Sequence, residues 1–220
     1  MSEPSRRVLR DSFGVGVATG AYGLSFGALA VAGGLAIPES CALSLLMFTG
    51  GSQFALVSTV TNGGSAGAGA ATAILLGSRN ALYGLSLSSL LKVRGVKRAA
   101  AAQLVIDEST AMAVGQDTER DSRLGFYATG LAVFVLWNLA TLIGALGARA
   151  IDDPSTYGLD AAASAAFVAL LAPRMQSRAA WAVAFGAVTV ALVLTPLVPS
   201  GVPVLCAALV AFLVGWRHPR

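Results

Sequence analysis

The sequence predicts an all-α fold of about six to eight hydrophobic helices that lie in a membrane. Hydrophobic residues make up 55% and charged residues 12% of the 220-residue chain, whereas soluble domains contain about 25% charged residues. The charges gather in short clusters, and the apolar stretches between them are long enough to cross about 30 Å of hydrocarbon. Since strand-like alternation is absent and lipid offers no hydrogen-bond partners, we expect helices to be the spanning elements.

Eight apolar segments follow one another along the chain, and we interpret residues 1–220 as one transmembrane domain. The segments are residues 12–36, 40–60, 67–91, 99–115, 124–148, 160–173, 179–198 and 201–216. Lysine and arginine favour the cytoplasmic side of a membrane. We therefore expect two cytoplasmic tails, residues 1–11 and residues 217–220.

The distribution of basic residues predicts that two segments, 40–60 and 99–115, are broken or re-entrant helices. If all eight segments crossed, the basic cluster at residues 92–98 would lie outside, against the positive-inside tendency. If the two segments enter and leave on one side, every lysine and arginine except Arg79 and Arg149 lies inside. Interrupted helices at membrane depth often mark a transporter's binding site.

The break in segment 40–60 carries a pattern typical of an anion site. Two glycines, Gly50 and Gly51, loosen the backbone, and Ser52 can cap a half-helix that starts near Gln53. The N-terminus of a helix attracts negative charge. We therefore expect Gly51, Ser52 and Gln53 to bind a carboxylate; a glycine kink that serves close packing is the alternative.

Small residues in segment 12–36 predict a helix-packing face. Their spacing of four, three and four residues brings them to one side of a helix, where a neighbouring backbone can approach closely. The alternative is that neighbouring side chains line a substrate site. The packing residues are Gly16, Gly20, Gly23 and Gly27, and the possible lining residues are Tyr22, Ser25 and Phe26.

Arg79 lies in the interior of segment 67–91, more than ten residues from either end. A charge there costs about 2.5–3.5 kcal/mol or more unless it is paired or faces water. We expect Arg79 to face a cavity, and Asn80 and Tyr83 extend the polar group because Tyr83 lies one turn further on. Snorkelling of Arg79 to the membrane surface is the alternative.

Asp107 and Glu108 are an acidic pair within segment 99–115. They can balance Arg79, hold a substrate ammonium group, or carry coupling protons. The alternative is a surface helix whose carboxylates lie in water. Asn138, in the middle of segment 124–148, is predicted to form hydrogen bonds between helices.

The sequence does not predict an enzyme, a metal site or a cofactor. Residues 23–27 match G-x-S-x-G, but that motif needs a strand–turn–helix context and a histidine partner. The single histidine, His218, lies in the basic C-terminal tail. No ATP-binding G-x-x-x-x-G-K-[ST] motif occurs, and no basic stripe interleaved with aromatic residues suggests nucleic acid.

Three runs of residues resemble the AzlC family of branched-chain amino-acid permease large subunits. They are Ser25–Ala30 (SFGALA), Gly51–Ala55 (GSQFA) and Arg79–Leu87 (RNALYGLSL), followed in the family's order by Asp107-Glu108-Ser109, Trp137, Thr141 and Gly144. The resemblance covers residues 10 to about 150. One departure is that Gly77 and Asn80 stand where the family usually has Asn and His, which puts substrate preference or coupling in doubt.

The resemblance implies a secondary transporter that exports neutral, valine-like amino acids across the bacterial inner membrane. It also implies a small membrane partner of the AzlD type and a proton or membrane-potential gradient as the energy source. A homo-oligomer of this complex is one assembly that we consider. On this interpretation the groups at Ser52, Gln53 and Arg79 receive the carboxylate, and Asp107 or Glu108 serves the ammonium or the proton. A non-transporting membrane scaffold and a passive channel are the alternatives.

Overall fold

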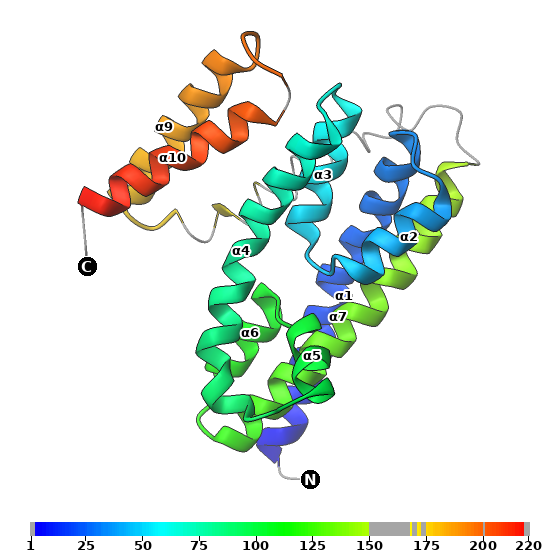
Figure 1. The fold of residues 1–220 in the computed structure, drawn as a ribbon. Helices are drawn as coiled ribbons and strands as arrows, with labels where there is room; N and C mark the ends of the chain where they lie inside the picture. The colour runs from blue at the N-terminus through cyan, green and yellow to red at the C-terminus, as the bar shows by residue number, and fades with distance from the viewer. Residues whose placement is uncertain (1–2, 150–167, 169–170, 173–174, 200, 218–220) are drawn as a thin grey trace.

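The computed structural model of the chain describes residues 3–149, 168, 171–172, 175–199 and 201–217 (Figure 1). Every regular element in these residues is a helix, which confirms the all-α prediction. Predicted segment 160–173 and the tail 217–220 lie largely outside the described residues. The helices described are α1 Glu3–Ala32, α2 Ile37–Leu46, α3 Gly50–Thr61, α4 Ala66–Leu91, α5 Val96–Gln103, α6 Asp107–Val114, α7 Glu119–Ala148, α9 Arg178–Leu194 and α10 Val202–Arg217.

Local sequence signals explain where several helices begin and end. The side-chain oxygens of Ser65, Thr118 and Ser177 accept hydrogen bonds from the first-turn amides of α4, α7 and α9, as N-cap residues do. After α1 and α3 the chain turns at Gly34 and Gly63, whose φ angles are +95° and +82°. Glycine adopts this left-handed conformation without steric cost, so the chain reverses there.

Helices α1 and α7 lie side by side and run in the same direction (Figure 1). The predicted glycine face of α1 is the face that packs on α7. A Cβ atom added to Gly16 would lie 2.7 Å from Ala132 Cβ, and one added to Gly20 would lie 2.7 Å from Leu136 Cβ. Farther along α1, Gly23 and Gly27 meet the α7 backbone in the same way, so the absence of side chains allows the close approach of the two helices.

The predicted interruption of segment 40–60 is confirmed, because α2 ends at Leu46 and α3 begins at Gly50. Helix α2 runs back along α7 to the middle of the fold, and α3 returns from there (Figure 1). Gly33, before α2, contacts Thr61 at the end of α3. The α2–α3 hairpin therefore enters and leaves at one end of the α1–α7 pair.

The position of this break differs from the prediction. Thr49, not Ser52, is the N-cap residue, although its side chain makes no capping hydrogen bond. Because α3 starts three residues earlier than expected, Ser52 lies within the first turn and faces α4. Its hydroxyl donates to the carbonyl oxygen of Ala73 at 2.8 Å, so Ser52 joins two helices and caps neither.

The predicted interruption of segment 99–115 is also confirmed, since α5 ends at Gln103 and α6 begins at Asp107. Lys92 Nζ lies 2.9 Å from Glu119 Oε1, which brings the residues before α5 close to the start of α7. The α5–α6 hairpin thus enters and leaves at the end opposite to that of α2–α3 (Figure 1). Basic residues at 6–10, 92–98 and 120–123 gather at this end.

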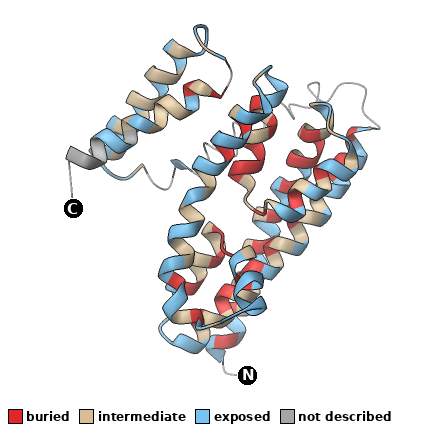
Figure 2. Ribbon diagram, viewed as in Figure 1, coloured by how far each residue is buried: buried red, intermediate tan, exposed pale blue. Residues whose placement is uncertain are grey.

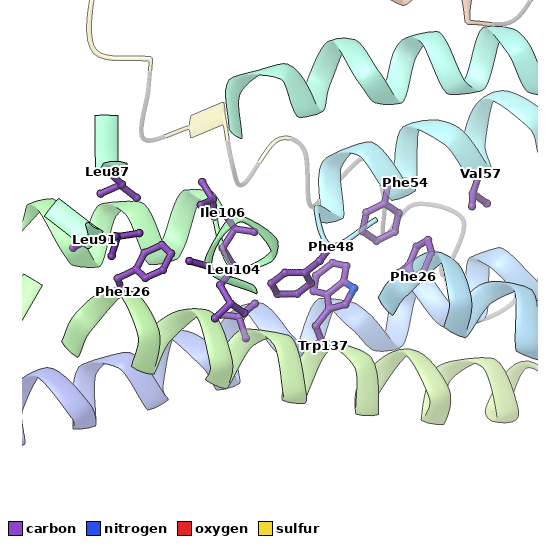
Figure 3. Close-up of a cluster of buried hydrophobic side chains, with 14 of the residues drawn as sticks. Phe26, Phe48, Phe54, Val57, Leu87, Leu91, Leu104, Ile106, Phe126 and Trp137 are labelled. Carbon is purple, nitrogen blue, oxygen red and sulfur yellow. The ribbon is translucent and has the colours of Figure 1, made fainter. Parts of the chain in front are cut away.

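The two breaks meet in the middle of the molecule. Gln103 Nε2, at the end of α5, donates to the carbonyl oxygen of Leu45 in α2 at 2.8 Å. Buried aromatic and aliphatic side chains pack around the two breaks on the inner side of the helices, among them Phe48, Phe54, Ile106 and Trp137 (Figure 3). Buried residues lie on the facing sides of the helices and exposed ones on the outer sides (Figure 2). The core therefore holds both breaks in place.

The start of α1 and the apolar surfaces of the long helices are relevant to the predicted membrane crossings. Helix α1 begins at Glu3, so residues 3–11 of the predicted cytoplasmic tail form its first turns. Among the described residues, α1 and α7 are the two helices long and apolar enough to cross a membrane by length and composition. The larger count of six to eight crossing helices stays a prediction. Large apolar side chains are exposed along α7, at Leu131, Val135, Leu139, Leu142 and Leu146.

Candidate functional site

A cavity of about 180 Å³ lies where the two helix breaks meet α1, α4 and α7. Its lining combines polar residues with aromatic and aliphatic ones from five helices and both breaks. Six of the residues predicted for the site reach it. These are Tyr22, Gly51, Arg79, Asn80, Asp107 and Glu108.

Arg79 and Asp107 form an ion pair in the cavity. Arg79 Nη2 of α4 lies 2.8 Å from Asp107 Oδ2 of α6, and the two side chains are 31% and 17% exposed. Asp107 is the first residue of α6, where the partial positive charge of the helix N-terminus favours a carboxylate. The structure thus shows one of the roles expected for the acidic pair, the balancing of Arg79.

Glu108 extends the acidic side of the cavity toward α1. It is partly buried, interacts with Asp107 and Arg79, and hydrogen-bonds Thr19. The cavity therefore contains two carboxylates beside one guanidinium group. The alternative of a surface helix with both carboxylates in water is wrong, because the break before α6 turns Asp107 and Glu108 inward.

Two buried polar atoms of cavity residues have no hydrogen-bond partner within the described part of the chain. They are Arg79 Nε and Asn80 Oδ1. Buried polar atoms in proteins are nearly always hydrogen-bonded, and leaving one unsatisfied costs about 1–3 kcal/mol. A polar ligand or water in the cavity would supply the missing partners.

The first turn of α3 presents backbone to the cavity through Gly50 and Gly51. The first amide groups of a helix have no intrahelical acceptor and carry a partial positive charge. Thr49 also lines the cavity at this point. This edge of the site therefore suits an anionic group, as the glycine pair predicts, although through Gly50 and Gly51 and not through Ser52.

Gln53 is buried behind the cavity and holds the first break together. Its Nε2 donates to the carbonyl oxygen of Met47 at 2.6 Å, at the end of α2. Its Oε1 accepts a hydrogen bond from Trp137 Nε1 of α7 at 3.0 Å. Because both ends of the amide are engaged and the side chain is fully buried, Gln53 does not line the cavity in which it is predicted to bind the carboxylate.

Ser109 holds the second break by a similar device. Its hydroxyl donates to the carbonyl oxygen of Leu104 at 2.6 Å and accepts from the amide of Ile106 at 3.1 Å. A single serine thus replaces the hydrogen bonds that the chain loses between α5 and α6. The sequence signal for this role is the short polar run at residues 107–109.

The apolar side of the cavity consists mainly of residues that sequence reasoning did not assign to a site. Phe48, Phe54, Ile106, Val133 and Trp137 form it. In an apolar segment such residues give no signal that separates a cavity wall from a lipid-facing surface. Trp137 could be noted through the family resemblance alone.

Three predicted lining residues lie outside the cavity. Phe26 is fully buried behind its wall, with ring centroids 5.6 Å from Phe54 and 6.3 Å from Trp137. Ser25 lies one turn beyond Tyr22 in α1 and does not line the cavity, whereas Tyr22 does. Tyr83 lies one turn beyond Arg79, farther from the helix breaks, and packs against the core.

Asn138 does not form the predicted bond between helices. Its Nδ2 donates to the carbonyl oxygen of Phe134, one turn earlier in α7, at 2.7 Å. The carbonyl is within reach of the side chain on the same helix, so the bond stays intrahelical. Its Oδ1 is buried without a partner in the residues that the structure describes.

These features define an all-α protein in which a cavity with charged groups lies between two interrupted helices, beside a pair of long apolar helices. The sequence model of one family, described as AzlC protein, matches residues 14–151, more than half of the chain. The chain belongs to the AzlC family, which relates it to membrane transport. The match includes every residue that lines the cavity. No curated protein and no solved structure shows significant similarity to the chain.

Proposed function

We propose that the chain is the large subunit of a secondary transporter that exports neutral, branched-chain amino acids across the bacterial inner membrane. One observation carries this proposal. The cavity between the two helix breaks combines groups for both charges of an amino acid with an apolar wall for its side chain. The family membership supports a role in membrane transport.

The carboxylate of the amino acid would bind between α3 and Arg79. The first-turn amides at Gly50 and Gly51 attract an anion, and Arg79 Nε is a buried donor that lacks a partner within the described residues. Nη2 of Arg79 already contacts Asp107. The guanidinium group can therefore hold Asp107 and a carboxylate at once, because its donors point in different directions.

The ammonium group of the amino acid would bind Glu108. Asp107 is engaged by Arg79, which leaves Glu108 as the second carboxylate of the site. In a cavity with apolar walls a carboxylate is stable when a cation or a proton neutralises it. Glu108 is therefore the residue at which an amino acid and a coupling proton would meet.

The size and lining of the cavity support a small apolar side chain. Its volume of about 180 Å³ is below the range of about 300–1,000 Å³ that is usual for drug-sized ligands. Phe48, Ile106 and Val133 offer contact to a branched aliphatic group. These features favour amino acids such as valine over large aromatic ones.

A gradient-driven mechanism and a small AzlD-type partner complete the proposal. The sequence contains no P-loop, and the family resemblance implies both a proton or membrane-potential gradient and the partner. The complex would export one small zwitterion, with lipid around the apolar outer faces. A homo-oligomer of this complex is compatible with the proposal.

Efflux of labelled valine, leucine and methionine from dipeptide-loaded cells tests the proposal. Cells that contain the chain together with an AzlD-type subunit should lose one or more of these amino acids faster, in a saturable manner. Unchanged efflux across the panel, with both proteins present in the membrane, would refute export. Non-saturable loss would indicate a passive channel.

Arg79→Ala separates transport from a purely structural role. A transporter should lose flux while the partner subunit still co-purifies, whereas a scaffold should lose the complex. Removal of a charge-assisted hydrogen bond worth about 1.5–3 kcal/mol corresponds to a loss of about 10- to 150-fold in affinity. Ser78→Ala, on the exposed side of the same helix turn, is the matched control.

A further inference from the structure

Trp137 of α7 contributes the largest side chain to the cavity wall and is held from three sides. The residue is 5% exposed, and that small exposure is toward the cavity that it lines. Its Nε1 donates to Gln53 Oε1 at 3.0 Å, which fixes the rotation of the indole. In Figure 3 the ring lies among Phe26, Phe48 and Phe54.

Aromatic contacts prevent the indole from tilting. The ring of Phe26 is nearly parallel to it, with an interplanar angle of 24° and centroids 6.3 Å apart. The ring of Phe54 meets it edge-on, at 87° and the same centroid separation. Both arrangements are favourable for aromatic pairs, so the tilt of the indole is determined by the two rings that pack against it.

Gly50 limits the movement of the indole of Trp137 toward α3. A Cβ atom added to Gly50 would lie 2.6 Å from Trp137 Cη2 and 3.1 Å from Cζ2. The six-membered ring therefore rests directly on the first turn of α3, and the residue at position 50 must be glycine for the indole to stay where it is. A larger residue would push the indole toward the cavity.

We propose that Trp137, positioned by Gly50 and Gln53, sets the upper limit on the length of the substrate side chain. This inference rests on the proposed function. The charged groups of the amino acid, held at Arg79, Glu108 and the start of α3, fix its α-carbon, so the side chain extends toward the apolar wall. One methylene in such a pocket changes discrimination by about 10- to 200-fold, and the cavity of about 180 Å³ leaves little spare room.

Two variants should shift the upper size limit of the substrate side chain in opposite directions. Trp137→Phe shortens the wall while it keeps an aromatic ring beside Phe26 and Phe54, so phenylalanine and methionine should become substrates. Gly50→Ala drives the indole into the cavity, so leucine should be lost while alanine is kept. Asn138→Ala, next to Trp137 but outside the cavity, is the matched control and should keep the wild-type preference.

The measurement is competition by unlabelled alanine, valine, leucine, methionine and phenylalanine against labelled valine counterflow, in proteoliposomes that contain the chain and its AzlD-type partner. A rise of about tenfold or more in the relative affinity for phenylalanine in Trp137→Phe, with the opposite trend in Gly50→Ala, supports the inference. Identical preference in the wild type and both variants would overturn it.

Failure of the inference and failure of the proposed function are distinguishable. If the wild-type complex transports no amino acid of the panel, the proposed function fails before any variant is compared. If a variant binds but does not transport, amino-acid-induced stabilisation of the purified complex reports the same size order. If Gly50→Ala does not fold, Trp137→Phe and Trp137→Leu decide the outcome, and an unchanged size order in both contradicts it.

Discussion

At the scale of single residues, the ion pair between Arg79 and Asp107 connects α4 to α6 beside the cavity. Arg79 comes from the middle of α4 and Asp107 from the first turn of α6, and their side-chain atoms lie 2.8 Å apart. Each charge depends on the other, because neither is fully exposed to solvent. The pair therefore couples the conformation of α4 to that of the second helix break.

A double-mutant cycle should measure this coupling. Arg79→Gln and Asp107→Asn each leave one partly buried charge without its partner, so each should lower the melting temperature of the purified complex. The double variant should lose less than the sum of the two, with an interaction energy of about 0.5–3 kcal/mol. Strictly additive losses would show that the two side chains do not interact.

Gln53 is the residue whose replacement should damage the first break most. Gln53→Leu has a similar volume but leaves the indole Nε1 of Trp137 without its acceptor. It also removes the side-chain bond to the carbonyl oxygen of Met47, which still accepts from the amide of Thr49. A buried donor left unsatisfied costs about 1–3 kcal/mol, so we expect a loss of about 1–3 kcal/mol or more in unfolding free energy. Denaturant unfolding in detergent measures it. A loss equal to that of Gln103→Ala, whose bond is exposed, would contradict the role.

The charged residues of the site could be predicted from the sequence more reliably than the uncharged polar residues that hold the helices. Arg79, Asp107 and Glu108 could be predicted because an ionised group in an apolar segment needs a partner or a cavity. Gln53 and Asn138 could not be assigned correctly, since an amide bonds equally well to a ligand, to its own helix or to a helix end. Apolar wall residues such as Phe48 carry no signal at all in a segment that is apolar throughout.

At the scale of elements, the glycine face of α1 determines how close α1 and α7 lie. The four glycines occupy successive turns of α1. Each glycine faces a residue of α7 that lies about one turn beyond the residue faced by the preceding glycine. Their spacing was sufficient to predict the face, because it depends only on helical periodicity. The partner helix was not predictable from the sequence, since several segments carry small residues.

Gly20→Ala should separate the two helices. The added Cβ would lie 2.7 Å from Leu136 Cβ and 3.2 Å from the α7 backbone, so α1 must shift, and overpacking of this kind costs about 1–3 kcal/mol. We expect a lower melting temperature. Gly14→Ala on the same helix, where nothing lies within 4 Å, should be neutral or stabilising by up to about 1 kcal/mol because alanine favours helix. Equal effects of both would refute the packing role.

The two helix breaks show how far sequence patterns reach at this scale. Their existence was predictable, because glycine pairs and acidic runs interrupt apolar helices. Their exact positions were not, because Thr49 and Ile106 occupy the N-cap positions without side-chain capping bonds. The side chains of Gln53 and Ser109, a few residues beyond the N-cap positions, hold the breaks instead.

At the scale of the whole molecule, basic residues gather at the end where the α5–α6 hairpin begins and ends. The N-terminus of α1, the loop after α4 and the start of α7 meet there through Ser5–Asp121 and Lys92–Glu119 contacts. The opposite end, where α2–α3 begins and ends, has few basic residues in the described part of the chain. By the positive-inside tendency, the basic end should face the cytoplasm.

Labelling of single cysteines tests this orientation. In a variant with Cys41 and Cys206 replaced by serine, Val96→Cys at the basic end should be protected from a membrane-impermeant maleimide in intact cells and labelled in inverted vesicles. Ala66→Cys, exposed at the opposite end, should show the reverse pattern. Labelling of both residues from the same side would contradict the arrangement of the hairpins across the membrane.

The attachment of the two hairpins at opposite ends of the molecule has a consequence for a solute in the cavity. Each hairpin is attached to the rest of the chain at one end of the molecule only, and their tips touch at the bond from Gln103 to Leu45. A solute in the cavity would therefore have a different hairpin on the side of each end of the molecule. Because neither hairpin includes α1 or α7, an outward movement of one hairpin would leave the other hairpin and the two long helices in place.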